Sequence, residues 1–379
     1  MGTDKLSIYL DNLAQTPADP RVTEWHAATS LALQGNSKSA EHAAGHRASS
    51  VLESAKSEVG NFVGRETDEV LFTPSASSAL WLALRDQIVR NGTRPLRVVA
   101  SAIEHSSLLE HLAAAERQGE AKVQLCPVEP DGRLDMQILG RLCRAGVDLV
   151  CVMAANNETG VILPVMEATN LAHEWGARVL VDASQAAGKL PIRAMLADVD
   201  LIVLSGAKFY GPRGVGVLAG SISSISRDLG SAVFGTPDAA AASAMALACS
   251  LRESEAEVDE VRIASLRDTL QAELLARITG LVVNGASAAR IAGALHVSSP
   301  HIAGKVVVAR LWGKIDVSTG APSRKGLSGP SHVLSAMRVD DWVAEGAVRI
   351  CVGRFNDAGE LAMAADLFAE AMNSDQPRM

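Results

Sequence analysis

Two ionisable side chains stand at the ends of consecutive apolar segments in the middle of the chain. Asp182 closes the segment 178–182, and Lys208 follows the segment 200–205. A lysine buried beside polar groups can lose its proton, and the neutral amine can form a Schiff base with a carbonyl compound. A carboxylate on the neighbouring strand suits the ring nitrogen of pyridoxal phosphate (PLP). The ion pair keeps that nitrogen protonated, so the ring can act as an electron sink. Taken alone, the spacing fits a simple ion pair or two helix caps equally well.

Other polar side chains follow apolar segments in the same way, and each could contribute to such a site. The run Ser75–Ser78 opens an expected helix, whose N–H groups and hydroxyls would hold a phosphate, although plain N-capping also explains it. His105 could stack on a planar ring or move protons, although a lone histidine is more often a packed or surface residue. Asn157 could bond a ring oxygen, although a polar turn has the same composition. Together these residues occupy successive positions in one expected crevice, which chance rarely arranges.

The alternation of the sequence predicts the scaffold that these residues need. Between about residue 70 and residue 220, short runs rich in Val, Leu and Ile alternate with longer amphipathic stretches. Such alternation is typical of a mostly parallel sheet covered by helices, so the fold class is α/β. The expected strands are 69–73, 97–101, 122–128, 147–154, 178–182, 200–205 and 214–218. Because ligands of such sheets bind at the carboxyl ends of the strands, the polar residues should meet there.

The pattern changes near residue 250. A long helical stretch over 254–278 leads into a further α/β segment and a terminal helix over 357–372, and the Ala-rich run 238–246 indicates the start of a helix. These changes predict a second, smaller domain. We therefore expect a large domain over 17–250 and a small domain made of 1–16 plus 251–379.

Composition narrows the classes of function. The chain has 379 residues, a formal net charge of −8 and no run of Lys and Arg, so direct nucleic-acid binding is not expected. With 48% hydrophobic and 21% charged residues, the composition excludes a disordered chain. The five cysteines are scattered without CxxC spacing, which argues against disulfides and metal sites and favours the reducing cytoplasm. The first residues lack the apolar core of a signal peptide, and no apolar run approaches the ~20 residues that span a membrane.

Several motifs occur in a fixed order along nearly the whole chain. They are Gly35-Asn36-Ser37, Ile103-Glu104-His105, Ala155–Gly160, Val181–Gln185, Lys208–Pro212 and Arg349–Phe355. With these motifs the chain resembles the class V aminotransferase superfamily and, within it, the NifS/IscS-type cysteine desulfurases. The resemblance implies a PLP-dependent homodimer of fold type I. A mostly parallel seven-stranded sheet would form its large domain, a smaller α/β domain would follow, and the active site would lie at the subunit interface.

The resemblance also implies a role for each residue of the expected crevice. Lys208 would form the Schiff base with PLP, the internal aldimine; Asp182 would pair with the ring nitrogen, and His105 would stack on the ring and move protons. Arg354 would hold the α-carboxylate of the substrate through a bidentate pair. The further implied contacts are Gln185 and Asn157 to the ring oxygen, Asn157 to the substrate, Ala76, Ser77 and Ser205 to the phosphate end of the cofactor, and Thr236 to the phosphate from the other subunit.

One loop departs from the desulfurase pattern. In desulfurases this loop carries the cysteine that attacks the substrate sulfur, whereas residues 318–326 read Ser-Thr-Gly-Ala-Pro-Ser-Arg-Lys-Gly, with Ser323 at the cysteine's position. A hydroxyl cannot hold sulfur as a persulfide and is a far weaker nucleophile than a thiolate. The family's histidine before the Schiff-base lysine is Ala207, which removes one phosphate contact, and the family's Arg-Ser-Gly-Thr segment is Val233–Thr236.

Three functions fit these residues. The first is a PLP enzyme that acts on a small amino acid by C–S lyase or aminotransferase-like chemistry, which needs no protein persulfide. The second is a desulfurase whose sulfur leaves to a small thiol or to another cysteine. The third is a non-catalytic dimeric scaffold, although a scaffold has no physical need to keep both Lys208 and Asp182. We expect the first function, with a sulfur- or selenium-containing amino acid as substrate by analogy and no membrane partner.

Overall fold

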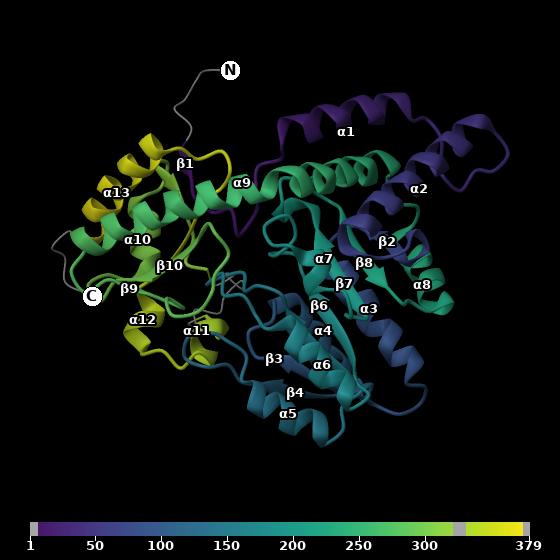
Figure 1. Ribbon diagram of the computed structural model, residues 1–379, viewed down its shortest axis with the longest axis horizontal. Coiled ribbons are helices and arrows are strands. Elements are labelled where there is room, and N and C mark those ends of the chain that lie inside the picture. The colour runs from purple at the N-terminus through teal and green to yellow at the C-terminus, as the bar shows by residue number, and fades with distance from the viewer. Residues whose placement is uncertain (1–6, 321–330, 374–379) are drawn as a thin grey trace.

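A seven-stranded sheet forms the centre of the protein (Figure 1), for which the computed structural model describes residues 7–320 and 331–373. Its strands, in sheet order, are β2 (Val70–Thr73), β8 (Gly216–Gly220), β7 (Leu201–Ser205), β6 (Arg178–Asp182), β5 (Leu149–Met153), β3 (Leu96–Ser101) and β4 (Ala121–Cys126). Strand β8 runs antiparallel to both of its neighbours, β2 and β7, and the other neighbouring pairs of this sheet are parallel. The predicted α/β class with a mostly parallel sheet is confirmed, and all seven strands overlap the expected segments.

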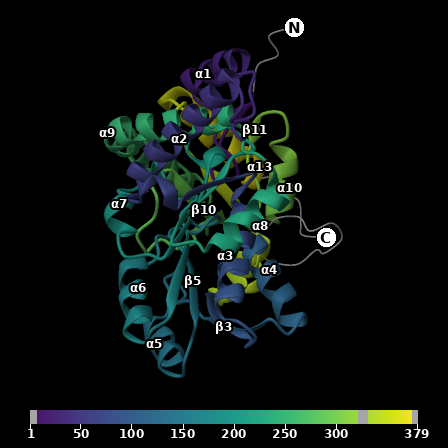
Figure 2. The ribbon, with the colours of Figure 1, turned by 90° about the vertical axis from the view of Figure 1, so that its right-hand side faces the viewer.

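Helices cover both faces of this sheet (Figure 2). One face carries α3 (Ala76–Arg90), α4 (Ser106–Arg117) and α8 (Ser224–Phe234), and the other carries α5 (Met136–Arg144), α6 (Val165–Glu174) and α7 (Ile192–Met195). The side chains of one strand alternate between the two layers: in β5, Leu149 and Cys151 pack in the core on the α3 side, and Val150 and Val152 pack in the core on the α6 side. Burial on both faces explains why the strands are continuously apolar in sequence.

A second, smaller sheet comes from the C-terminal third of the chain. Its strands are antiparallel, in the order β12 (Ala347–Cys351), β10 (Ala294–Ser298) and β9 (Val282–Val283). The neighbouring helices are α10 (Gly304–Arg310), α11 (His332–Ala336), α12 (Asp341–Glu345) and α13 (Ala358–Asn373). Side chains of this region form an apolar core of their own. The division of the chain into domains 17–250 and 1–16 plus 251–379 stays a prediction.

One long helix runs from the large sheet to the small one. Helix α9 spans Ala239–Arg277, and Asp238 caps it by accepting hydrogen bonds from the N–H groups of Ala240 and Ala241. The helix predicted over 254–278 therefore begins earlier than expected, because the Ala-rich run belongs to the same helix. Across the described residues no single helix is both long and apolar enough to cross a membrane; α8 and α9 meet that test only as a pair bent by 116°.

The N-terminal segment brings a separate part of the chain to the sheet. Strand β1 (Ile8–Tyr9) pairs in parallel with β11 (Ile315–Asp316) of the C-terminal region. The chain then crosses the turn that follows β7, where Thr16 N–H donates to the carbonyl of Ala207 (2.9 Å) and the Thr16 hydroxyl accepts from Tyr210 N–H (2.7 Å). Residues 11–16 are thereby fixed beside Lys208. Helices α1 (Pro20–Ala32) and α2 (Ala43–Val63), which the sequence pattern does not predict, follow and lie against α9.

Candidate functional site

The carboxyl ends of the sheet strands enclose a cavity of about 200 Å³. It contains eight of the side chains that the sequence predicts for the site, contributed by five separate strand ends or helix starts. These eight are Ala76, Ser77, His105, Asn157, Asp182, Gln185, Ser205 and Lys208. The remaining lining residues are Ser75, Leu80, Ser107, Met153, Ala155 and Ser184. The expected meeting of these residues at one edge of the sheet is therefore present in the fold.

The N-terminus of α3 forms one wall of this cavity. Ser75 is its N-cap, with its hydroxyl accepting a hydrogen bond from Ser78 N–H at 3.1 Å. Backbone N–H groups at a helix start and the helix dipole together favour an anion. Gly216 of β8 lets the sheet approach this turn closely, because a Cβ there would lie 2.3 Å from the Ser75 carbonyl carbon. This wall suits the phosphate of the predicted cofactor.

Lys208 lies directly after β7, at the end of the short turn Gly206–Lys208. Its ammonium donates hydrogen bonds to the carbonyls of Leu13 (3.1 Å) and Ala14 in the N-terminal segment. Burial lowers the pKa of Lys208 to about 8, with a smaller contribution from nearby cations. A neutral, nucleophilic amine is therefore much more accessible here than at an ordinary lysine.

Two buried carboxyl groups belong to this region, Asp182 in the cavity lining and Glu104 near it. Asp182 ends β6, is buried, and accepts a hydrogen bond from Ser184 N–H at 3.0 Å. Glu104 is fully buried, and burial together with the Asp182 charge raises the pKa of Glu104 to about 8. Oε1 of Glu104 accepts a hydrogen bond from Met153 N–H at 2.7 Å, and its Oε2 has no partner among the described residues. Near neutral pH, Glu104 is thus mostly a neutral acid.

His105 faces the same cavity as the N-cap of α4. Its Nδ1 accepts a hydrogen bond from Ser107 N–H at 3.2 Å, so the ring proton of the neutral imidazole is on Nε2. Burial lowers the pKa of His105, and the neighbouring Asp182 carboxylate opposes that shift. A neutral ring in this position suits stacking on a planar, electron-poor ligand.

Two buried polar atoms of the cavity have no hydrogen-bond partner among the described residues. They are Oδ1 of Asn157 and the hydroxyl oxygen of Ser184. Unpaired buried polar groups cost free energy in a folded protein unless a ligand or water satisfies them. With an anion-binding helix start, a lysine of lowered pKa and a carboxylate, these atoms give a set of partners that fits PLP.

The structure does not bring Arg354 into this cavity. Its guanidinium donates to Asp19 (3.1 Å) and Glu255 (2.6 Å) and lies 5.4 Å from the centre of the Tyr210 ring. Asp259 approaches the same group to 3.3 Å. Three carboxylates already surround this arginine, so the expected substrate contact is not favoured by its surroundings.

Arg349 of β12, which the sequence interpretation did not select, lies much closer to the site. It is 7% exposed, donates to Oδ1 of Asp11 (2.8 and 3.0 Å) and donates to the carbonyl of Asn157 (3.0 Å). Because Asn157 lines the cavity, this hydrogen bond places the guanidinium beside it, and the charge of Arg349 also lowers the pKa of Lys208. Strand β12 was not among the predicted strands. The sequence interpretation therefore could not tell that Arg349 lies within a strand and that Arg354 lies after it.

Two further predicted positions lie elsewhere. Thr236 follows α8 and lines a separate cavity of about 480 Å³ together with Lys38 and Arg227, and it is not among the described residues that line the Lys208 cavity. Its contact with the phosphate of another subunit stays a prediction. Ser323 lies outside the described residues.

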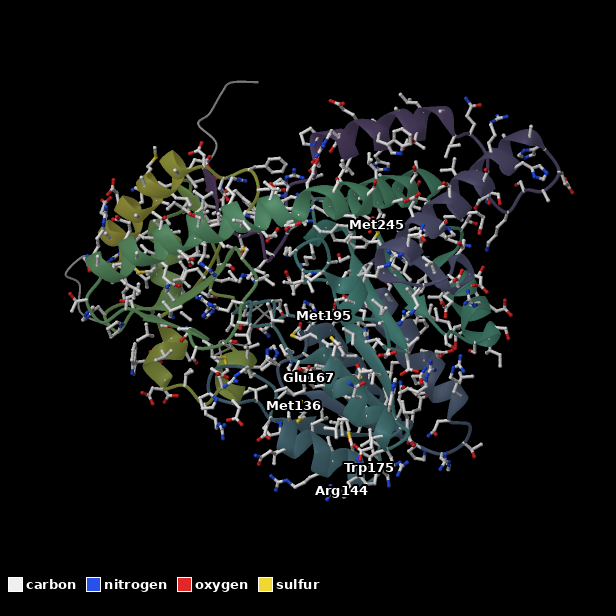
Figure 3. The ribbon with its side chains drawn as sticks, viewed as in Figure 1. Met136, Arg144, Glu167, Trp175, Met195 and Met245 are labelled. Carbon is white, nitrogen blue, oxygen red and sulfur yellow. The ribbon has the colours of Figure 1, made fainter. Side chains whose placement is uncertain are left out.

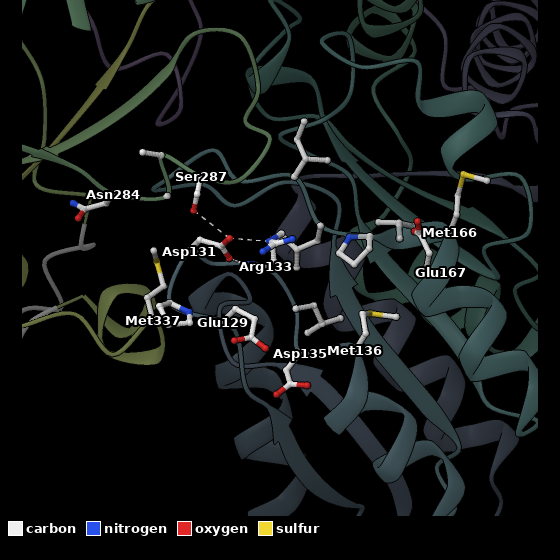
Figure 4. Close-up of a pocket in the computed structure, with 18 of the residues that line it drawn as sticks. Glu129, Asp131, Arg133, Asp135, Met136, Met166, Glu167, Asn284, Ser287 and Met337 are labelled. Carbon is white, nitrogen blue, oxygen red and sulfur yellow. Dashed lines mark hydrogen bonds and ion pairs between the residues drawn. The ribbon is translucent and has the colours of Figure 1, made fainter. Parts of the chain in front are cut away.

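A larger cavity, of about 1270 Å³, lies apart from this site (Figure 4). It contains Met136, Met195 and Glu167, which come from α5, α7 and α6 (Figure 3). One of its carboxylates, Asp131, already accepts bonds from Arg133 (2.8 Å) and from the Ser287 hydroxyl (3.3 Å). The described residues that line this cavity include no lysine or histidine, so they do not repeat the chemistry of the Lys208 cavity.

Comparison with known proteins links this arrangement to one family. The family described as "Aminotransferase class-V" matches residues 8–232. The cysteine desulfurase IscS of Anaeromyxobacter dehalogenans (strain 2CP-C) is 33% identical over 376 residues, which cover 97% of this chain and 92% of that protein. The mitochondrial cysteine desulfurase of Arabidopsis thaliana is 30% identical over 372 residues, covering 95% of this chain and 81% of that protein.

Solved structures give the same result for the fold. A NifS-like protein superposes with a TM-score of 0.86 at 29% identity, over 96% of this chain and 99% of that one. DndA from Streptomyces lividans gives a TM-score of 0.73 at 29% identity, over 90% of this chain and 98% of that one. The predicted resemblance and the predicted fold are both confirmed.

Proposed function

The chain belongs to the class V aminotransferase family as a cysteine desulfurase-like, PLP-dependent enzyme, and we propose that it cleaves the C–S bond of a small amino acid. The observation that carries this proposal is the gathering of Lys208, Asp182 and His105 around one small cavity with an anion-binding helix start. When bound, PLP supplies an electron sink that stabilises negative charge at the substrate α-carbon.

The residues of the cavity would hold that cofactor in one orientation. The α3 start, with Ser77, and Ser205 would bind its phosphate, and Asp182 would pair with its ring nitrogen. The unpartnered Asn157 Oδ1 and the Gln185 amide would meet its polar ring substituents. Lys208 would hold the cofactor covalently, and its low pKa would let the released amine move the proton at the substrate α-carbon.

We assign the substrate carboxylate to Arg349 rather than Arg354. Within the described residues, its hydrogen bonds use one N–H on each guanidinium nitrogen, Nε, Nη1 and Nη2. One N–H on each terminal nitrogen stays available, and two parallel N–H groups suit a carboxylate. Asp11 would hold the guanidinium in place without blocking that pair.

The fate of sulfur depends on whether a thiol reaches it. All five cysteines are free and buried, and burial raises the pKa of Cys126 and Cys351 to about 12, so neither is a ready thiolate. Ser323 stands at the loop position where a desulfurase has its cysteine. Without a protein thiolate, cysteine would lose sulfide by β-elimination, and water would convert the remaining fragment to pyruvate and ammonia.

Two further properties belong to this proposal. We propose a homodimer in which Thr236 of one subunit serves the site of the other. We also propose a cytoplasmic location, which the five free cysteines support because a reducing compartment keeps thiols unpaired.

The products formed from L-cysteine test the proposal. The purified protein should show a visible cofactor band that the Lys208→Ala variant lacks, and L-cysteine should yield sulfide and pyruvate in equal amounts. Ser323→Cys should divert part of the product to alanine, because it restores a thiol at the loop position. The lyase assignment fails if the unmodified protein, supplied with dithiothreitol as sulfur acceptor, makes alanine in place of pyruvate. If the protein takes up no PLP, the result would instead support the third function, a non-catalytic dimeric scaffold.

A further inference from the structure

Lys189 is a second lysine beside the candidate site, and it lies outside the cavity lining. It stands in the turn that follows β6, four residues after Gln185, and it is half-buried. Its ammonium donates a hydrogen bond to Oε1 of Gln185 at 3.3 Å. No role for Lys189 follows from the cofactor contacts proposed above, although this contact joins it directly to one of the residues that make them.

The hydrogen-bond partners of Gln185 determine where its amide oxygen and its amide nitrogen lie. A lysine ammonium can only donate, so the atom beside Lys189 must be the amide oxygen. A carbonyl can only accept, so the atom at 2.8 Å from the Leu13 carbonyl must be the amide nitrogen. Lys208 donates to the same Leu13 carbonyl at 3.1 Å. The amide N–H₂ group therefore lies on the side of Lys208 and the oxygen on the side of Lys189.

The turn that carries Lys189 is itself held in place by α9. Arg252 is fully buried, and its Nε donates to the carbonyl of Gly188 at 2.8 Å. Gly188 has φ +67, and a Cβ there would lie 2.9 Å from side-chain atoms of Arg252 and Phe209. Lys189 N–H closes the turn on the carbonyl of Ala186 at 3.0 Å. Lys189 is thus presented to Gln185 by a fixed backbone.

We propose that Lys189 is a positioning residue, which holds the Gln185 carboxamide with its oxygen turned away from the cavity and its N–H₂ group turned toward the bound cofactor. The inference rests on the proposed role of Gln185 in binding PLP. With the ammonium absent, the carboxamide can turn over and present oxygen to an oxygen of the ligand, which removes a hydrogen bond and adds repulsion. Lys189 acts only through Gln185 in this respect and touches no reacting atom.

The charge of Lys189 has a second, separate effect on Lys208. It is the largest of the charge contributions that lower the pKa of Lys208, after burial itself. Arg349 acts in the same direction, whereas Asp182 and Asp11 oppose it. Around Lys189 the charged and titratable groups are Glu260 and Arg252 of α9, Cys351 of β12, and Lys208. Removing the Lys189 charge should therefore raise the pKa of the Lys208 nitrogen.

The experiment separates the hydrogen bond from the charge. Lys189→Met removes both, while Lys189→Gln removes the charge and keeps a donor for Gln185. Apparent PLP dissociation constants would be measured by equilibrium dialysis of the full-length proteins. Loss of one hydrogen bond predicts that Lys189→Met binds PLP about 2- to 10-fold more weakly, with Lys189→Gln close to the unmodified protein. In a Gln185→Ala background, Lys189→Met should add almost nothing, because its partner is already gone.

A pH titration of the visible cofactor band gives an independent readout. Both Lys189 variants should shift its midpoint to higher pH, by up to about one unit, because both lack the cation. The exposed Lys305→Met variant should leave the midpoint and the dissociation constant unchanged. If Lys189→Met weakens PLP binding by the same factor with Gln185 present and in the Gln185→Ala background, Lys189 does not act through Gln185. That result would overturn the positioning role and leave Lys189 with a structural role. Normal covalent PLP uptake by Lys208→Ala would refute the proposed function instead.

Discussion

Two arginines five positions apart have opposite surroundings. Arg349 meets one carboxylate and one carbonyl beside the cavity, whereas Arg354 is surrounded by three carboxylates next to the Tyr210 ring. Both belong to the same motif, so the sequence motif identifies a pair of candidates without ranking them. Lys208, Asp182 and His105 were predictable because each follows an apolar run that had to be a strand. The arginines follow no predicted strand: Arg349 lies in β12, opposite His296 of β10, and Arg354 lies three residues after the end of β12.

Substitution of each arginine by lysine should separate their roles. Arg349→Lys loses the forked geometry for a carboxylate and should lower kcat/KM for L-cysteine by about 10-fold or more, mainly through KM. Arg354→Lys should lower the melting temperature, because it weakens contacts with Asp19 and Glu255, and should leave KM nearly unchanged. Steady-state kinetics and thermal melts of both variants provide the comparison. The reverse pattern, with KM raised only by Arg354→Lys, would return the carboxylate to Arg354.

At the scale of elements, the burial of a strand or helix determines whether its sequence pattern predicts it. The strands of the large sheet are buried on both faces, so each is a continuous apolar run that is easily located. Helix α1 buries only Val22 and has no apolar stripe to identify it. Helix α9 changes character along its length: its first half buries small alanines, and its second half exposes Val258 and Val261. Such a change of pattern resembles the end of one helix and the start of another. The sequence therefore predicted separate helical stretches over 238–246 and 254–278 where the structure has one helix.

The contact between β8 and the start of α3 is testable through Gly216. Gly216→Ala would place a Cβ 2.3 Å from the Ser75 carbonyl carbon and 2.6 Å from Ala76 N, so the helix start must move. Overpacking of about 1–3 kcal/mol predicts PLP binding weakened by about 5- to 150-fold, measured by equilibrium dialysis. The control is Gly140→Ala in α5, whose Cβ would meet only Leu171 at 3.6 Å and which should leave PLP binding unchanged. Unchanged binding in Gly216→Ala would exclude the α3 start as the phosphate site.

At the scale of the molecule, the site depends on segments distant in sequence. The N-terminal residues 11–16 contact Lys208 and Arg349, the sheet supplies the cavity, and β12 supplies Arg349 itself. The sequence interpretation grouped residues 1–16 with 251–379, but the individual contacts are set by the pairing of β1 with β11 and of β12 with β10, and neither pairing was predicted. The cavity that contains Thr236 also includes Thr73 and Pro74, which directly precede Ser75 of the Lys208 cavity. A contribution of Thr236 within its own chain is therefore the physical alternative to one across a dimer.

Hybrid dimers distinguish these two arrangements. Thr236→Asp should block phosphate binding by charge repulsion, and Lys208→Ala removes the covalent anchor, so each variant alone should be inactive. If Thr236 serves the partner's site, a hybrid of the two variants contains one site with both residues intact. Co-expression of differently tagged chains in equal amounts should then restore about a quarter of the unmodified activity, since half the dimers are hybrids with one working site of two. If Thr236 acts within its own chain, every site lacks one residue, and the hybrids isolated on both tags remain as inactive as the parent variants.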